Sequence, residues 1–344
     1  MSKTQIAKKI AFAAGSVLLL ALLVTLVVKN GREAETSNPD GAPMVRTSEK
    51  GMPTNVLLVG EDRTSGLYDV LMLLHVDPES SRASILQIPR DTYAAYAEGS
   101  YRKINGAAKR LGGMEELCAF LSESLGVSID RYVCMELEAF SKIVDALGGV
   151  EITLPDALHY DDPSQNLSIH LPKGEQTLDG KTAEYFVRYR MGYVRGDLGR
   201  MDAQKLFLAA LAKKARSSLG VLSAVRLAIT VLPYVETNLG IAEVTSLVRT
   251  AFSIPDEAVL MVTLPGKEAV AQQSGASYYV LSSKATYELL VSYFGATGTF
   301  DPLFVFRNSR YNDFCEIYDG YEAYIVYSMG EIDKEGIEIE KTGG

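Results

Sequence analysis

The sequence predicts an α/β domain preceded by one membrane-spanning helix. Three observations lead to this prediction: a long uncharged run near the start, three short apolar runs after it, and a later alternation of strand-like and helix-like segments. Short apolar runs bounded by turn residues are typical of buried central strands. Their alternation with helices indicates an α/β sandwich-like architecture. With 344 residues, 47% of them hydrophobic, the chain has enough material for a large core.

The uncharged run extends over Ile10–Val28 and is bounded by lysines on both sides. Nineteen residues at about 1.5 Å each give a helix of ~28 Å, close to the hydrocarbon thickness of a bilayer. A cleaved signal peptide is the alternative, but its apolar region is usually about 7–15 residues long and ends at a small-x-small site. This run is longer and ends Thr-Leu-Val-Val-Lys, which favours a retained anchor. The amino-terminal lysines predict a single-pass protein of the cell membrane, with residues 1–29 as cytoplasmic tip and anchor and the rest outside.

The net charge restricts the partners of the external part. Residues 1–29 contain four lysines and no acid, so the charge of −9 for the whole chain becomes −13 for residues 30–344. Such an acidic domain has no general affinity for nucleic acid or anionic lipid. Nucleic acid is therefore not an expected partner, and a phosphate site requires a local group of arginines.

The cysteines leave two interpretations open. Cys118 falls on a predicted helix and Cys134 on the strand that follows, so they form either a disulfide or two buried thiols, while Cys315 stands alone. With no CxxC spacing and only three histidines, we do not expect a structural zinc site.

After a polar, flexible stalk over residues 30–53, the apolar pattern predicts the elements of the domain in order. They are strands 55–60, 70–76 and 83–88, helices 104–111 and 114–125, strand 131–137, helix 138–147, strand 150–154, a loop over 156–175, helix 178–186 running into an extended 187–190, helices 202–217, 219–232 and 241–252, and strand 258–264. From about residue 297 the chain becomes aromatic and acidic, which indicates either a few added strands or a small appendage over 296–344.

Two acids lie at predicted strand ends. Asp62 closes the first strand and Asp69 opens the second. Strand ends meet at one edge of a sheet, so the two carboxylates are expected to face each other across a loop. Paired oxygen donors suit Mg²⁺, which completes its shell with waters and substrate phosphate oxygens.

Arginines form the second pattern. Arg90 follows the third strand, Arg188 and Arg190 point the same way if their segment is extended, and Arg200 opens the long helix with Gln204 one turn beyond on the same face. Arg195 lies between these segments. Guanidinium groups are planar and always charged, which suits bidentate phosphate contacts. Surface salt bridging is the alternative, but in so acidic a chain the grouping favours an anion site.

The chain resembles the LytR–CpsA–Psr family from about residue 54 to about residue 295. The similarity lies in ordered segments: Asn55–Asp62, Tyr68-Asp69, Ile88–Asp91, Lys103–Asn105, Val144–Val150, Val187–Arg190, Gly196–Arg200 with Gln204, and Thr263–Gly266. This resemblance implies an α/β domain with a central mixed β-sheet flanked by helices and a hydrophobic tunnel for a lipid tail. Departures include Tyr68-Asp69-Val70, where the family usually has Ser-Asp-Thr, and Ala203, where an arginine is frequent.

The resemblance also implies a function. Family members are cell-envelope enzymes that transfer glycopolymers, such as wall teichoic acid or capsular polysaccharide, from polyprenyl-pyrophosphate carriers to peptidoglycan. In this role Mg²⁺ and the arginines would neutralise the pyrophosphate while a sugar hydroxyl attacks the phosphorus nearer the glycan. The implied metal ligands are Asp62 and Asp69; the implied pyrophosphate-binding residues are Arg90, Arg188, Arg190, Arg200, Gln204, Lys103 and Asn105; the implied catalytic residues are Arg90, Asp91 and Asp197, with either Asp91 or Asp197 accepting the hydroxyl proton.

Two other functions stay open from the sequence. Water in place of the sugar hydroxyl would make the same site a lipid-pyrophosphate hydrolase. A non-catalytic envelope or regulatory protein is the other, although an external domain cannot reach DNA directly.

Overall fold

The protein is described by a computed structural model over residues 53–62, 67–94, 103–154, 156–162, 167–231, 235–271, 274–297 and 322–339. The predicted anchor, nearly all of the predicted stalk and Cys315 lie outside these residues. Within them, no helix combines the length and apolarity needed to cross a membrane.

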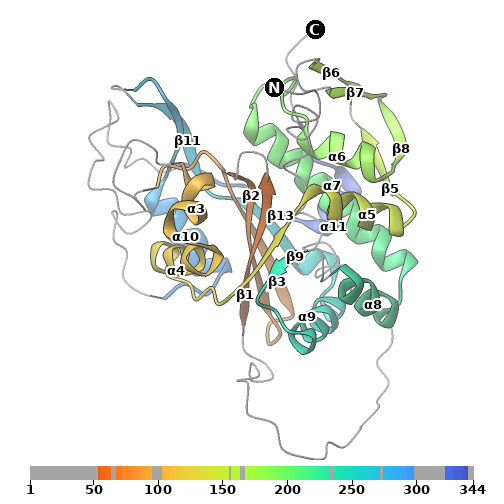
Figure 1. The fold of residues 1–344 in the computed structure, drawn as a ribbon, viewed down its shortest axis with the longest axis horizontal. Coiled ribbons are helices and arrows are strands. Elements are labelled where there is room, and N and C mark those ends of the chain that lie inside the picture. The colour runs from red at the N-terminus through yellow and green to blue at the C-terminus, as the bar shows by residue number, and fades with distance from the viewer. Residues whose placement is uncertain are drawn as a thin grey trace, which may run out of the picture.

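A mixed seven-stranded sheet runs through the middle of the molecule (Figure 1). Its order is β13-β10-β3-β2-β1-β4-β9, with strands β1 (Thr54–Asp62), β2 (Leu67–Asp77), β3 (Arg82–Ile88), β4 (Arg131–Met135), β9 (Val235–Thr237), β10 (Val259–Thr263) and β13 (Tyr327–Ser328). Strand β1 is antiparallel to β2 and parallel to β4, and β3 is antiparallel to β2 and parallel to β10. The predicted α/β class with a central mixed sheet is therefore confirmed.

Both faces of the sheet are buried because successive residues of the central strands are apolar. In β1, Val56 and Leu58 belong to one core cluster while Leu57 and Val59 belong to another, and all four are fully buried. Side chains alternate between the faces of a strand, so a continuous apolar run supplies two cores.

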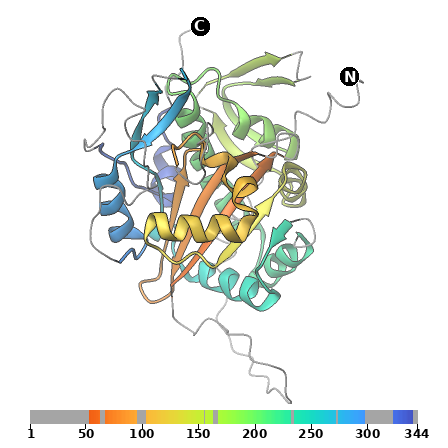
Figure 2. The same cartoon turned by 60° about the vertical axis from the view of Figure 1, so that its left-hand side comes forward.

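Helices cover the two faces in separate groups (Figures 1 and 2). One group packs on the Leu57 face and comprises α3 (Ala107–Leu111), α4 (Met114–Leu125) and α10 (Ser283–Tyr293). The other packs on the Val56 face and comprises α5 (Leu137–Ala146), α6 (Gly180–Arg188), α7 (Asp197–Ser218), α8 (Val221–Val231), α9 (Ile241–Ser253) and α11 (Met329–Glu335). The result is a three-layer α/β/α sandwich.

The predicted loop over 156–175 is wrong, because this segment contains two strands and the start of a third. Strand β6 (Leu158–Asp162) pairs with β7 (Leu167–Leu171), and β8 (Gly174–Leu178) pairs with β5 (Val150–Leu154). Apolar residues alternate with polar ones in these short strands, so only one face is buried and the apolar signal is weak.

Two predicted helix boundaries are also wrong. Residue 188 is helical, because α6 runs to Arg188 and an i, i+4 ion pair at 2.8 Å joins Arg188 to Glu184. Arg188 and Arg190 therefore do not share one extended strand. Helix α7 begins at Asp197 instead of residue 202. Gly196, at φ +50°, ends the preceding loop, and a carboxylate in the first turn complements the positive end of the helix dipole.

The described part of the C-terminal tail joins the domain. Strand β13 extends the sheet next to β10, and α11 packs against α7. A hairpin of β11 (Gly266–Val270) and β12 (Ser277–Leu281) lies beside α10. Neither these two strands nor α10 had been predicted from the sequence.

Cys118 and Cys134 are both buried and do not form a disulfide with each other. Burial chiefly raises the pKa of Cys118 to about 12, with smaller contributions from Asp130 and Glu115. The second interpretation of this pair, two buried thiols, is therefore the one that the structure supports.

Candidate anion site at the sheet edge

The topology brings the predicted site segments to one edge of the sheet. Strands β1 and β3 both run antiparallel to β2, so their carboxyl ends and the start of β2 lie at the same edge. Asp62 closes β1, Asp69 lies near the start of β2, and Arg90 follows β3 after Pro89. Ligands of open α/β sheets bind at this kind of edge, beyond the carboxyl ends of strands.

A β-bulge adjusts the local geometry at Asp69. Gly60 pairs with Val70 and Glu61 with Tyr68, so the register shifts between Gly60 and Glu61 and Asp69 has no residue of its own opposite it. Bulges increase local twist and re-aim a side chain. Here Asp69 reaches Arg90 from the neighbouring strand.

Arg90 lies between two carboxylates. Its Nη1 donates to Asp69 Oδ1 at 2.7 Å, and its Nε lies 3.5 Å from Asp197 Oδ1. Burial would lower the pKa of Arg90, but Asp197 and then Asp69 outweigh it and raise this pKa above the ordinary value. Arg90 is therefore held as a cation at the rim of the core.

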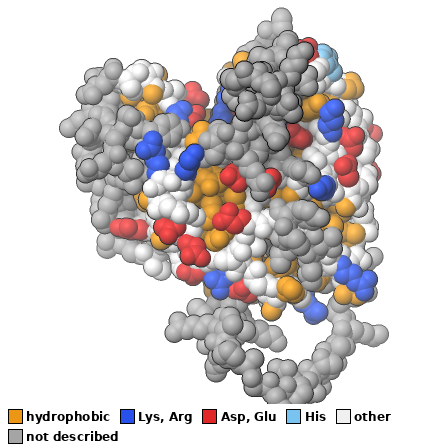
Figure 3. Space-filling view, viewed as in Figure 1, with side chains coloured by type: hydrophobic (Ala, Val, Ile, Leu, Met, Phe, Trp, Pro, Cys, Tyr) orange, Lys and Arg blue, Asp and Glu red, His pale blue; other side chains and the backbone are white. Residues whose placement is uncertain are grey.

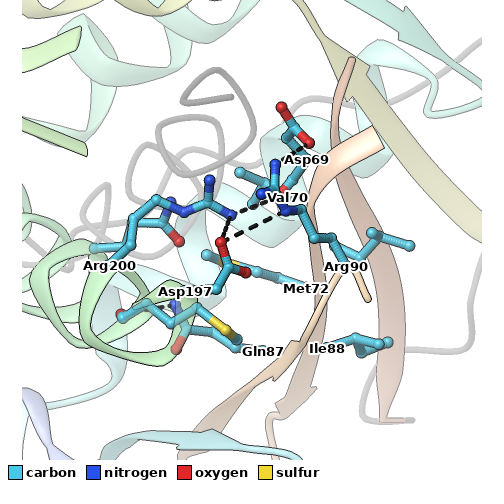
Figure 4. A pocket seen from close by; sticks show the side chains of 11 residues that line it. Asp69, Val70, Met72, Gln87, Ile88, Arg90, Asp197 and Arg200 are labelled. Carbon is cyan, nitrogen blue, oxygen red and sulfur yellow. Dashed lines mark hydrogen bonds and ion pairs between the residues drawn. The ribbon is translucent and has the colours of Figure 1, made fainter. Parts of the chain in front are cut away.

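Arg200 enters the same group from the first turn of α7. Its side chain is 3% exposed, and its Nη2 lies 2.8 Å from Asp197 Oδ1 and 3.4 Å from the backbone oxygen of Asp69. Burial is the main cause that lowers the pKa of Arg200, and Asp197 opposes it. Figure 4 shows Arg90 and Arg200 approaching Asp197 from opposite sides.

The two guanidinium groups keep unused donors. The Nε atoms of Arg90 and Arg200 are buried and make no hydrogen bond, and neither does Asp197 Oδ1, which lies 3.5 Å from Arg90 Nε as an ion pair only. A buried donor without an acceptor costs about 1–3 kcal/mol, more when it is charged. The two guanidinium groups could therefore donate further hydrogen bonds to the oxygens of an anionic ligand.

Polar and apolar side chains together form the pocket around these arginines. It is lined by Asp69, Val70, Leu71, Met72, Gln87, Ile88, Arg90, Asp197, Arg200, Met201 and Gln204. Gln204 Nε2 donates to the backbone oxygen of Val187 at 3.2 Å, which ties α7 to the end of α6. The space left between the side chains is about that of one water molecule, so the ion pairs fill the centre of the pocket.

The other predicted arginines do not line this pocket. Arg188 pairs with Glu184 at 2.8 Å. Arg190 is exposed, and its charge contributes to the lowered pKa of Arg200. Arg195 is exposed and pairs with Asp202 at 3.2 Å, away from the pocket lining.

Asp91 and the Lys103–Asn105 segment lie together next to Arg90. Lys103 Nζ is 2.8 Å from Asp91 Oδ1, and the buried Asn105 donates its backbone N–H to the oxygen of Arg90 at 3.1 Å. These contacts fix the chain on both sides of Arg90. They support Arg90, but none of the three residues lines the pocket.

One buried network was not predicted from the sequence. Lys205, 2% exposed, donates to Asp202 Oδ1 at 2.7 Å and to Thr263 Oγ1 at 2.8 Å. Thr263 donates to Gln87 Oε1 at 3.2 Å, and Gln87 Nε2 donates to the backbone oxygen of Met201 at 3.1 Å. The network joins α7 to β3 and β10 and so holds the turn that carries Arg200. The Thr263–Gly266 segment was noticed in the sequence, but its partner in α7 was not.

The acids offer an oxygen-only donor set. Asp69 uses one carboxylate oxygen for Arg90, and its side chain is 15% exposed. The backbone of Asp62 pairs with Leu67 on the same hairpin, although its side chain lies outside the described part of the chain. Among the side chains that the structure describes, no group of three or more His, Cys, Asp or Glu is arranged around a metal position. Two carboxylates that leave most positions to water and phosphate fit Mg²⁺ in kind.

Comparison with known proteins adds a family and a fold. The model of the LytR_cpsA_psr family matches residues 23–292. The polyisoprenyl-teichoic acid–peptidoglycan teichoic acid transferase TagV of Bacillus subtilis is 29% identical over 239 residues, which are 67% of this chain and 61% of TagV. The enzyme TagU of Oceanobacillus iheyensis, which carries the same description, is 34% identical over 171 residues, 47% of this chain and 52% of TagU. The chain thus spans about half to three fifths of the length of these curated relatives.

The crystal structure of B. subtilis TagV has a similar fold. It superposes with a TM-score of 0.61 at 26% identity and covers 72% of this chain and 100% of that chain. The three-layer arrangement and the sheet edge described above therefore belong to a known architecture.

Proposed function

The chain belongs to the LytR_cpsA_psr family, and we propose that it transfers a glycopolymer from a polyprenyl-pyrophosphate carrier to peptidoglycan. The relatives TagV and TagU, both described as teichoic acid transferases acting on peptidoglycan, support this class of reaction. The observation that carries the proposal is the pair of the buried Arg200 and the partly exposed Arg90, whose Nε atoms make no hydrogen bond.

Two neighbouring guanidinium groups fit a diphosphate, that of Arg200 buried and that of Arg90 16% exposed. Asp197 lies within ion-pair distance of both arginines, and Asp69 neutralises Arg90 a second time. Four groups with no net charge are stable without a ligand, yet each arginine can exchange a carboxylate for a phosphate oxygen. Charge-assisted bidentate contacts of Arg with phosphate are among the strongest hydrogen bonds in proteins.

Asp62 and Asp69 would hold Mg²⁺, which would withdraw charge from the phosphate oxygens when bound. Binding of the diphosphate to Arg90 would free Asp69 for this role. The carboxylate that neutralises Arg90 in the empty pocket would thus become a metal ligand in the filled one.

Side chains of this protein stabilise charge and accept a proton during the transfer. A peptidoglycan sugar hydroxyl forms a bond to the phosphorus nearer the glycan, the bond from that phosphorus to the bridging oxygen breaks, and polyprenyl phosphate leaves with the electron pair. Arg90 and Arg200 stabilise the negative charge on the phosphate oxygens and on the departing phosphate. Both candidate proton acceptors are ion-paired, Asp197 with Arg90 and Arg200 and Asp91 with Lys103, but only Asp197 lines the pocket. We therefore assign the hydroxyl proton to Asp197.

The apolar part of the pocket is suited to the lipid end of the carrier. Val70, Met72, Ile88 and Met201 line the pocket below the arginines and continue into the core. The space between the pocket side chains is now about that of one water molecule, so they would have to move apart before the isoprene units next to the diphosphate could pack among them. With the predicted anchor in the cell membrane, the domain would take its substrate from the external surface of that membrane.

A transfer assay tests the proposal. The full chain in detergent is incubated with Mg²⁺ and a radiolabelled polyprenyl-pyrophosphate glycan, with and without peptidoglycan, and label in the insoluble wall fraction is counted. We expect attachment only when peptidoglycan and Mg²⁺ are both present. Release of glycan without attachment would identify the hydrolase instead, and absence of both products would contradict catalysis at this site. The exposed Arg82→Ala variant is the control and should retain full activity.

A further inference from the structure

A second charged cluster lies on the β6–β7 hairpin, away from the pocket. His159 and His170 face each other across the two strands as register partners. Their Nδ1 atoms are 3.2 Å apart, and the ring planes are inclined by 60° with centroids 5.4 Å apart. Both side chains are exposed, and histidine atoms are visible at the upper right of Figure 3, where Figure 1 places this hairpin.

The far side of one ring is fixed by a carboxylate. His170 Nε2 lies 2.9 Å from Asp161 Oδ1, and the same oxygen accepts a hydrogen bond from Ser168 Oγ at 2.7 Å. An ionised carboxylate only accepts hydrogen bonds, so Nε2 of His170 carries the proton. In the neutral ring the Nδ1 lone pair then points toward His159.

The spacing of the two Nδ1 atoms matches a shared metal ion. Two nitrogens at about 2.0–2.1 Å from a tetrahedral zinc ion lie ~3.3–3.4 Å apart, close to the 3.2 Å observed. A carboxylate on the outer nitrogen is also the usual partner of a metal-bound histidine. We propose that His159 and His170 bind one divalent transition-metal ion, of which Zn²⁺ is the representative, through their Nδ1 atoms, with Asp161 orienting His170.

Two protein ligands leave coordination positions open to water or to an outside ligand. The histidines are 11 positions apart on a segment that the sequence assigned to a loop, so only the strand register makes them a pair. The hairpin also contacts the anion site indirectly, because Tyr189 Oη donates to the backbone oxygen of His159 at 3.5 Å, and Tyr189 lies between Arg188 and Arg190. A bound ion would hold β6 and β7 together beside that segment.

Zinc titration of the full chain in detergent tests this inference. The metal-free protein competes for Zn²⁺ with a chromophoric chelator, and we expect one Zn²⁺ per chain at this site. His159→Gln and His170→Gln should each remove the binding, and Asp161→Asn should weaken it by about 10–100-fold. All three positions are exposed, so the far-ultraviolet circular dichroism spectrum should not change.

Two matched variants act as controls. Asp156→Asn removes another exposed carboxylate just before β6 and should bind Zn²⁺ as the unmodified chain does. Asp69→Asn removes a carboxylate of the sheet edge and should also bind it unchanged. Equal zinc affinity in the unmodified chain and both histidine variants would overturn the proposal, and so would failure of the unmodified chain to bind Zn²⁺. In either case the histidines would form only a hydrogen bond.

Discussion

Helix α7 carries two buried cationic groups that differ in how completely their donors are used. Lys205 has a carboxylate and a hydroxyl as hydrogen-bond acceptors. Arg200, little more than one turn earlier, shares Asp197 with Arg90 and leaves its Nε without an acceptor. Buried polar groups are normally paired, so a missing partner requires a reason. The satisfied group holds the helix in place, and the unsatisfied one is available for a ligand.

The largest expected effect on stability concerns Lys205. Lys205→Met leaves the largely buried carboxylate of Asp202 with only the exposed Arg195, 3.2 Å away, as its ion-pair partner. This should lower the free energy of unfolding by at most about 3–5 kcal/mol, the cost of other broken buried ion pairs. Urea denaturation followed by circular dichroism measures the change. Lys213→Met is the matched control on the same helix: its 2.8 Å ion pair with Asp333 is exposed, and its loss should cost about 0–1 kcal/mol.

The double variant Lys205→Met/Asp202→Leu distinguishes a broken pair from a general packing defect. Replacement of both partners of a buried pair by apolar groups is often neutral or stabilising, so most of the lost stability should return. A double variant as unstable as Lys205→Met would contradict the view that this network acts through a matched charge pair.

The largest expected effect on activity concerns Arg200→Lys. The lysine keeps the charge but removes the planar fork and the Nε donor. Loss of one preorganised donor to a developing oxyanion typically lowers kcat by about 10²–10³-fold. The transfer assay measures this change, and unfolding in urea should show a much smaller loss of stability than for Lys205→Met. An Arg200→Lys variant with full activity would show that the unused donor has no catalytic role.

Stabilisation by a bound ligand tests whether Arg200 is available for a ligand. Inorganic pyrophosphate with Mg²⁺ should raise the melting temperature, since a ligand at 100 times its Kd stabilises the folded state by about 2.7 kcal/mol. Arg200→Lys should reduce the shift greatly, while Lys213→Met should leave it intact. Equal shifts in the original chain and in Arg200→Lys would place pyrophosphate binding elsewhere.

The smallest effect is expected at the contact between the C-terminal strand and the satisfied network. Lys205 Nζ lies 5.8 Å from the centroid of the Tyr327 ring. Tyr327→Leu should lower the free energy of unfolding by about 0.5–2 kcal/mol through loss of the cation–π contact. Tyr327→Phe keeps the ring and should retain most of that stability. If the two variants lose equal stability, the hydroxyl matters and not the ring.

The sequence predicted the centre of the molecule well. The runs that became β1, β2 and β3 are apolar at successive positions, as expected for strands that are buried on both faces. The sequence placed Asp62 and Asp69 at one sheet edge and Arg90 at the end of the third strand, but it did not predict the 2.7 Å ion pair between Asp69 and Arg90. The family resemblance is confirmed by the match over residues 23–292. The roles of these residues and of Mg²⁺ stay predictions.

Other features depend on tertiary packing that leaves little trace in sequence. A lysine in a polar stretch of helix is usually exposed, and Lys205 is buried only because β10 and Tyr327 cover it. The short strands β6 and β7 have one buried face, so His159 and His170 carried no signal until their register was known. Arg195 fitted the arginine pattern, but the turn at Gly196 sends it toward Asp202.

The place of β10 in the sheet has a consequence for the folding of the newly made chain. Strand β10 pairs with β3 on one side and with β13 on the other, so its two neighbours come from nearly opposite ends of the domain. Strand pairings between residues so distant in sequence form slowly, because the entropy cost of closing a long loop comes before the pairing contributes any stabilising free energy. Until residues 327–328 have been synthesised, β10 is an open edge that invites pairing with other chains. A chain shortened before Tyr327 should therefore aggregate while it folds even though every residue of the anion pocket is present.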